Sequence, residues 1–145
     1  MFREASPHFA TVPCAEAHKR FPNQPIRAVV TTSDVWPHLA GIREYAAEGI
    51  PIYALDLNQP ILNRVIADPR TSKPDALARS PRKAQFHLVY DKEVLGTGAN
   101  RLEIYPTRGE TSGRQMMVYF PKYNFSTVAT RFRVGGTARF SIRRM

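Results

Sequence analysis

A run of β-branched and apolar residues near the N-terminus most constrains the fold of this chain. Residues 26–32 (IRAVVTT) are apolar at consecutive positions and rich in valine and threonine. This pattern is typical of a strand that is buried on both faces, as in parallel sheets covered by helices. The run therefore predicts a strand that other parts of the fold cover on both faces.

Helix and strand patterns alternate on either side of this run. Helices are expected over 13–21, 37–49 and 58–68, each with a proline near its first turn, where a helix tolerates one. The apolar stripe of the second helix consists of Leu39, Ile42, Tyr45 and Ala46. Residues 50–55 (IPIYAL) form the next apolar strand. Because strands that alternate with helices usually pair in parallel, this half of the chain predicts a parallel sheet.

The second half of the chain has a different pattern. Residues 69–81 are polar and rich in proline, which predicts a surface loop. Short segments with period-two character then follow at 84–90, 93–98, 100–106 and 115–121. Turn-forming residues separate them, so we expect an antiparallel set joined to the α/β part. The predicted class is α/β (α+β), with a mixed sheet and helices.

Composition excludes several kinds of protein. The apolar content of 43% over 145 residues is ordinary for one globular domain. No segment approaches the roughly 20 apolar residues that span a bilayer, and the N-terminus lacks the pattern of a signal peptide. We therefore expect no membrane segment and a cytoplasmic location. Cys14 is the only cysteine, so it is a poor candidate for a structural zinc site and is interpreted as an ordinary helical residue.

The net charge of +9 suggests a nucleic-acid partner, because lysine and arginine bind phosphates. Five arginines lie after Phe125, where there is no acidic residue, which leaves a net charge of +4 for the preceding chain. The basic excess is thus concentrated in the tail, and the body has no basic stripe. A nucleic-acid-binding module is the least favoured of the functions considered.

Several segments together resemble the second half of a metallo-β-lactamase-fold domain, from about Ala15 to Lys122. The resemblance lies in the order and spacing of residues 18–32, 41–66, 74–78, 91–106 and 116–122. It implies an αββα sandwich with zinc held by loops at the sheet edges. It also implies a zinc-bound hydroxide that attacks an ester, amide or phosphoester.

The zinc motif of that family is degenerate in this chain. The family pattern H-x-H-x-D-H falls on Ser33, Val35, Pro37 and His38, so only the last ligand is kept. A later family histidine falls near Thr111 and is also absent. Because valine and proline offer no donor atom, the resemblance implies that the usual dinuclear site cannot assemble.

His38 is therefore the first candidate metal ligand, with Asp34, Asp56 and Glu110 as replacement oxygen ligands. The alternatives are a histidine that bonds the backbone at a helix start and solvated loop carboxylates, of which Asp34 is also a natural helix cap. Trp36 either lines a groove beside these residues or packs on the sheet edge. The other histidines, His8, His18 and His87, show no ligand spacing. No catalytic or cofactor-binding residue is assigned.

Two further departures from the family concern the extent of the chain. The first half of the family domain is missing, so residues 1–124 are interpreted as an incomplete domain. An exposed sheet would then favour a homo-oligomer. Residues 125–145 are interpreted as a basic tail whose composition is typical of a shifted reading frame.

These interpretations favour a non-catalytic or truncated protein of the metallo-β-lactamase fold that has lost its zinc ligands. No cofactor is then expected. The alternative is a divergent hydrolase in which zinc or another divalent metal, held by His38, Asp34 and Glu110, acts on an unidentified small-molecule substrate.

Overall fold

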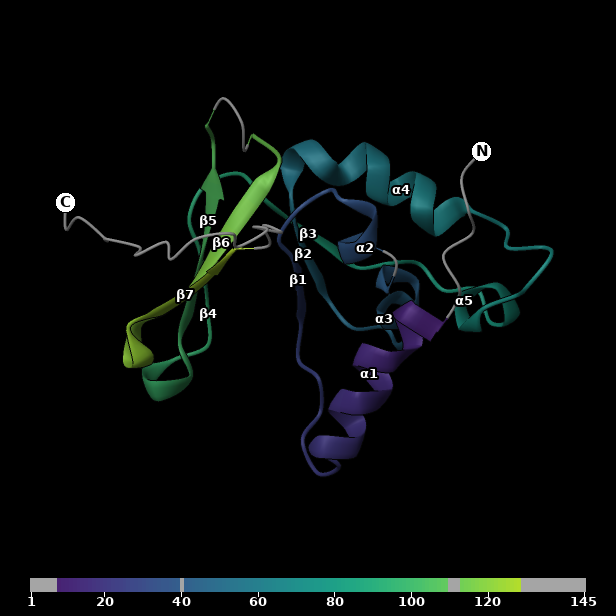
Figure 1. The fold of residues 1–145 in the computed structure, drawn as a ribbon, viewed down its shortest axis with the longest axis horizontal. Helices are drawn as coiled ribbons and strands as arrows, with labels where there is room; N and C mark the ends of the chain where they lie inside the picture. The colour runs from purple at the N-terminus through teal and green to yellow at the C-terminus, as the bar shows by residue number, and fades with distance from the viewer. Residues whose placement is uncertain (1–7, 40, 110–112, 129–145) are drawn as a thin grey trace, which may run out of the picture.

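The computed structural model describes residues 8–39, 41–109 and 113–128. Within these ranges the chain forms a layer of helices, a parallel sheet and an antiparallel sheet, stacked side by side (Figure 1). The helices are α1 (His8–Arg20), α2 (Trp36–Leu39), α3 (Ile42–Glu48), α4 (Gln59–Ala67) and α5 (Ala76–Arg79). The strands are β1 (Val29–Thr31), β2 (Ile52–Leu55), β3 (Phe86–Val89), β4 (Glu93–Leu95), β5 (Leu102–Thr107), β6 (Gln115–Phe120) and β7 (Phe125–Val128).

The central layer is the parallel sheet, with the strand order β1-β2-β3. Ile52 of β2 lies opposite Val29 of β1 and opposite Phe86 of β3. Strand β1 is covered on both faces, because the half-buried Val29 packs against the core under the helices and the half-buried Val30 against the core under the second sheet. The mixed α/β class and the parallel pairing of the first two strands are confirmed.

The core between the helices and the parallel sheet follows the predicted apolar stripe. Its buried residues are Leu39, Ile42, Ala46, Ile52, Ala54, Leu62 and Leu77. Two helices, α2 and α3, stand where the sequence predicted one, and α3 ends at Gly49, whose φ of 74° is left-handed. Glycine adopts that conformation without steric cost, so the predicted end of the helix is confirmed.

Three expectations about the elements were wrong. Residues 84–90 were placed in the antiparallel set, but β3 pairs in parallel with β2, because α4 and α5 provide a crossover between them. The predicted surface loop 69–81 contains the helix α5, whose N-cap Asp75 accepts a hydrogen bond from the amide of Ala78. Helix α1 begins at His8, ahead of the predicted start at Pro13.

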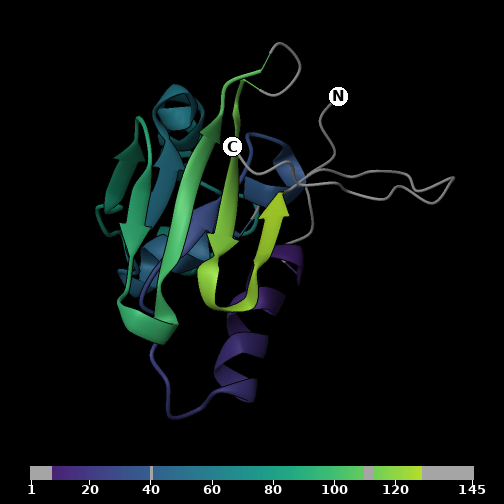
Figure 2. The ribbon, with the colours of Figure 1, turned by 90° about the vertical axis from the view of Figure 1, so that its left-hand side faces the viewer.

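The antiparallel sheet has the strand order β4-β5-β6-β7 and lies against the parallel sheet. Its inner face meets Leu55 and Val89 through Ile104 and Met116, all of them buried. Its outer face is turned toward the viewer in Figure 2, and none of the described helices covers it. The metallo-β-lactamase-like sandwich stays a prediction, and so does the homo-oligomer expected from an exposed sheet face.

Strand β7 uses the first four residues of the segment that begins at Phe125, and Phe125 pairs with Phe120 of β6. Residues 129–145, which hold all five arginines of the basic tail, lie outside the described residues. Among the described helices, none combines the length and apolarity needed to cross a membrane.

Candidate functional site

The parallel pairing places the carboxyl ends of β1, β2 and β3 at one edge of the sheet. Asp34 follows β1, Asp56 follows β2 and Tyr90 follows β3 directly. Open α/β sheets bind their ligands at this edge, because the loops that follow the strands converge there. We refer to it as the strand-end edge.

Two arginines from the connection between β5 and β6 reach over the strand-end edge. The Nη2 atom of Arg108 lies 3.1 Å from Oδ1 of Asp56 and donates to the carbonyl of Tyr90 at 2.7 Å. The Nε atom of Arg114 lies 3.8 Å from Oδ2 of Asp34. Each aspartate at this edge therefore faces a guanidinium.

Hydrogen bonds to backbone carbonyls also fix Arg114 and the start of β6 to this edge. Asn58, which is fully buried, donates from Nδ2 to the carbonyl of Arg114 at 3.0 Å. The guanidinium of Arg114 donates to the carbonyl of Leu57 at 2.6 Å. The amide of Met116 donates to the carbonyl of Thr32 at 2.9 Å. These contacts join the two sheets and hold Arg114 above the ends of β1 and β2.

Chemically, the strand-end edge suits anions better than metal ions. A metal ion needs carboxylates that are free to coordinate it, whereas Asp34 and Asp56 already face positive charges. The side chains of Arg108 and Arg114 remain about half exposed, at 48% and 50%. Their remaining N–H groups can donate to a carboxylate or phosphate.

Of the three predicted metal ligands, the structure describes the side chain of Asp34 alone. Asp34 lies at the strand-end edge, half-buried. His38 belongs to α2, but the placement of its side chain is outside what the structure describes, and Glu110 lies outside the described residues altogether. The ligand set His38, Asp34 and Glu110 stays a prediction.

A second cluster of ligand-type side chains was missed by sequence reasoning. The thiol of Cys14 donates to Oε1 of Glu48 at 3.0 Å, and Nε2 of His18 lies 2.9 Å from Oε2 of the same carboxylate. Cys14 and His18 are one turn apart on α1, and this four-residue spacing is the signal that could have found them. Glu48 comes from the end of α3, 30 residues or more away in the chain.

Electrostatics in this cluster differ between the thiol and the carboxylate. Burial, followed by the hydrogen bond and charge of Glu48, raises the pKa of Cys14 to about 12. Burial also acts to raise the pKa of Glu48, but hydrogen bonds from Cys14 and His18 outweigh it and lower that pKa. At neutral pH the cluster is thus a neutral thiol and an ionised carboxylate.

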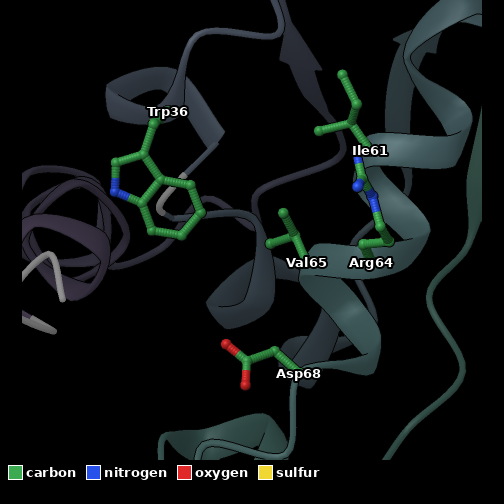
Figure 3. Close-up of a pocket in the computed structure, with 5 residues that line it drawn as sticks. All are labelled: Trp36, Ile61, Arg64, Val65 and Asp68. Carbon is green, nitrogen blue, oxygen red and sulfur yellow. The ribbon is translucent and has the colours of Figure 1, made fainter. Parts of the chain in front are cut away.

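Trp36 lines a shallow groove of about 360 Å³ between α2 and α4. Its ring faces Ile61 and Val65 of α4 across the groove, and Asp68 lies at the far end (Figure 3). Arg64 completes the lining. The groove holds few polar groups, so it offers a contact surface rather than a catalytic arrangement.

Comparison with known protein families and with curated proteins finds no match to this chain.

Proposed function

We propose that this protein is a non-catalytic α/β protein of metallo-β-lactamase-like architecture. In this proposal, arginine–aspartate pairs occupy the edge that binds zinc in that family. The observation that carries the proposal is the position of Arg108 beside Asp56 and of Arg114 beside Asp34. The degenerate zinc motif, with Ser33, Val35 and Pro37 at ligand positions, supports it.

The electrostatic argument concerns a cation at the strand-end edge. A divalent ion about 4 Å from one guanidinium is repelled by about 8 kcal/mol at an effective dielectric constant of 20. Each guanidinium thus offsets the attraction that the carboxylate beside it exerts on the ion, so the edge attracts a cation only after Arg108 and Arg114 have moved away. Such a movement would break the bonds from Arg114 to Leu57 and from Arg108 to Tyr90.

The competing function is the divergent hydrolase. The length of the contact between Arg114 and Asp34, 3.8 Å, favours it, because this pair is looser than that between Arg108 and Asp56. In that case His38, Asp34 and Glu110 would hold a metal ion whose bound water attacks the substrate.

One set of measurements separates the two functions. Wild-type protein, His38→Ala and Asp34→Asn are loaded with zinc or manganese, and bound metal and hydrolysis of generic ester and phosphoester substrates are measured. We expect the two variants to match the wild type in both readouts. Metal-dependent turnover that is lost in both variants would contradict the proposal.

A gain-of-binding variant provides the matched control. Arg108→Ala combined with Arg114→Ala removes the repulsion and frees both aspartates. If the guanidiniums are what excludes cations, this variant binds manganese more tightly than the wild type does. Unchanged manganese binding in a folded double variant would count against the electrostatic argument.

A further inference from the structure

The cluster of Cys14, His18 and Glu48 brings three kinds of metal ligand to one place. Their ligand atoms, a sulfur, a ring nitrogen and a carboxylate oxygen, all lie within 4.8 Å of one another. Two helices supply them: α1 provides Cys14 and His18, and α3 provides Glu48 at its end. Within the described residues, this is the group whose geometry matches a metal site.

We propose that Cys14, His18 and Glu48 bind a zinc ion that fastens α1 to α3. Zinc prefers thiolate, imidazole and carboxylate ligands, with bonds of about 2.0 to 2.3 Å in tetrahedral geometry. The ligand atoms of such a site lie roughly 3.3 to 3.8 Å apart. Cys14 and His18 contact different oxygens of Glu48, at 3.0 Å and 2.9 Å, and one ligand atom from each of the three residues lies within 4.8 Å of the others. Rotation of the side chains would bring these three atoms to the spacing that zinc requires. A water molecule would take the fourth position.

Zinc binding also changes the protonation of the cluster. The thiol proton of Cys14 now points at Glu48; zinc replaces that proton, which leaves to solvent, and the sulfur binds as a thiolate. The raised pKa of Cys14 belongs to the metal-free state, because a bound cation reverses the local electrostatics. Glu44, one turn before Glu48 on α3, adds a second negative charge that acts on Cys14.

The proposed zinc site is separate from the strand-end edge. Glu48 ends α3, and the chain then turns through Gly49 into the beginning of β2, so the cluster lies at the opposite end of the parallel sheet from Asp34. Figure 1 shows α1 at the lower end of the helical layer, away from the loops that follow the strands. The zinc site thus does not depend on the proposed function.

Cobalt substitution tests the site directly. Cobalt(II) bound to a thiolate has a charge-transfer band in the near ultraviolet, and Cys14 is the only cysteine, so this band can report only Cys14. We expect one equivalent of cobalt to produce the band in the full chain and one equivalent of zinc to bleach it. The melting temperature should rise with zinc concentration, because zinc binds the folded state.

Three variants assign the ligands. Cys14→Ala removes the band, whereas His18→Gln and Glu48→Gln lower the cobalt affinity by about 100-fold or more, since even changes beyond the ligands cost 10- to 100-fold. The His18 side chain is half exposed, at 49%, so His18→Gln leaves the metal-free fold intact even if Cys14→Ala does not. His87→Ala is the matched control, because His87 stacks on Tyr53 in the parallel sheet, outside the cluster.

Two outcomes would overturn the zinc site. One is the absence of a cobalt band and of bound zinc in folded wild-type protein, which would leave only the hydrogen bonds to Glu48. The other is zinc that stays bound in His18→Gln and Glu48→Gln. Zinc lost in His38→Ala but kept in His18→Gln would instead contradict the proposed function.

Discussion

Arg43 and Asp75 form a two-point ion pair inside the helical layer. Nε of Arg43 lies 2.5 Å from Oδ2 of Asp75, and Nη2 lies 3.0 Å from Oδ1. The same guanidinium donates to the carbonyls of Val65 and Ile66 at the end of α4, at 2.9 and 2.6 Å. Asp75 in turn caps α5. One buried arginine therefore connects α3, α4 and α5.

We predict that breaking this pair destabilises the fold. Both side chains are buried, at 3% and 9% exposure, so Arg43→Met leaves the carboxylate of Asp75 without its partner and should lower the free energy of unfolding by about 3–5 kcal/mol. Urea denaturation measures the change. Arg20→Met is the control, since the pair of Arg20 with Glu16 is exposed and contributes about 1 kcal/mol or less. Equal effects of the two substitutions would refute the role of Arg43.

A second prediction concerns acid stability and the outer face of the antiparallel sheet. There the carboxylate of Glu103 accepts hydrogen bonds from Tyr105, Lys92 and Arg101, and these contacts, that of Tyr105 foremost, lower the pKa of Glu103 from 4.5 to about 2. The folded pKa lies below the unfolded one, so the stabilisation is complete above pH 4.5 and is lost as the pH falls toward 2.

Glu103→Gln checks this prediction, because it removes the titrating group. Stability should depend less steeply on pH between 4.5 and 2 in the variant than in the wild type, as measured by denaturation at a series of pH values. Parallel stability curves in that window would show that the contacts around Glu103 do not stabilise the fold.

A third prediction concerns Gly49 at the end of α3. A side chain at this position would have to adopt a φ of 74°, and its Cβ would lie 2.4 Å from Nη1 of Arg82. Gly49→Ala should lower the free energy of unfolding by about 1–2 kcal/mol, because alanine is strained in the left-handed conformation. Displacement of the Arg82 side chain would add to this loss. Gly98→Ala is the matched control, since Gly98 has a φ of 54° and open space around its Cβ position. A smaller effect at Gly49 than at Gly98 would contradict a contribution from Arg82.

Local sequence patterns predicted correctly those features of the fold that depend on residues close together in the chain. The stripe of Leu39, Ile42 and Ala46 is buried as expected, and α4 ends before Asp68 and Pro69 because proline disfavours a helical residue before it. The direction of β3 was predicted wrongly. The sequence of a short apolar strand does not distinguish parallel from antiparallel pairing. The strand beside it in the sheet, here β2, determines which of the two forms.

The candidate sites likewise combine features that follow from the sequence with contacts that depend on tertiary packing. Parallel pairing was enough to place Asp34 at the end of a strand. Its partner Arg114, however, comes from a connection 80 residues later, and no spacing rule relates the two. The sequence analysis took Cys14 for an ordinary helical residue and found no ligand spacing for His18, although the two lie four residues apart on one helix. Glu48 joins them only because α1 packs against α3.

By itself, the sequence determined the alternation of strands and helices in the first half of the chain and the apolar faces that they bury, because these depend on residue type and short-range spacing. Tertiary packing alone decided the direction of β3, the arginines over Asp34 and Asp56, and the meeting of Cys14 and His18 with Glu48. The physical reason is that charge pairing and metal coordination act over a few ångströms in space. Only the packed layers bring groups from distant parts of the chain that close.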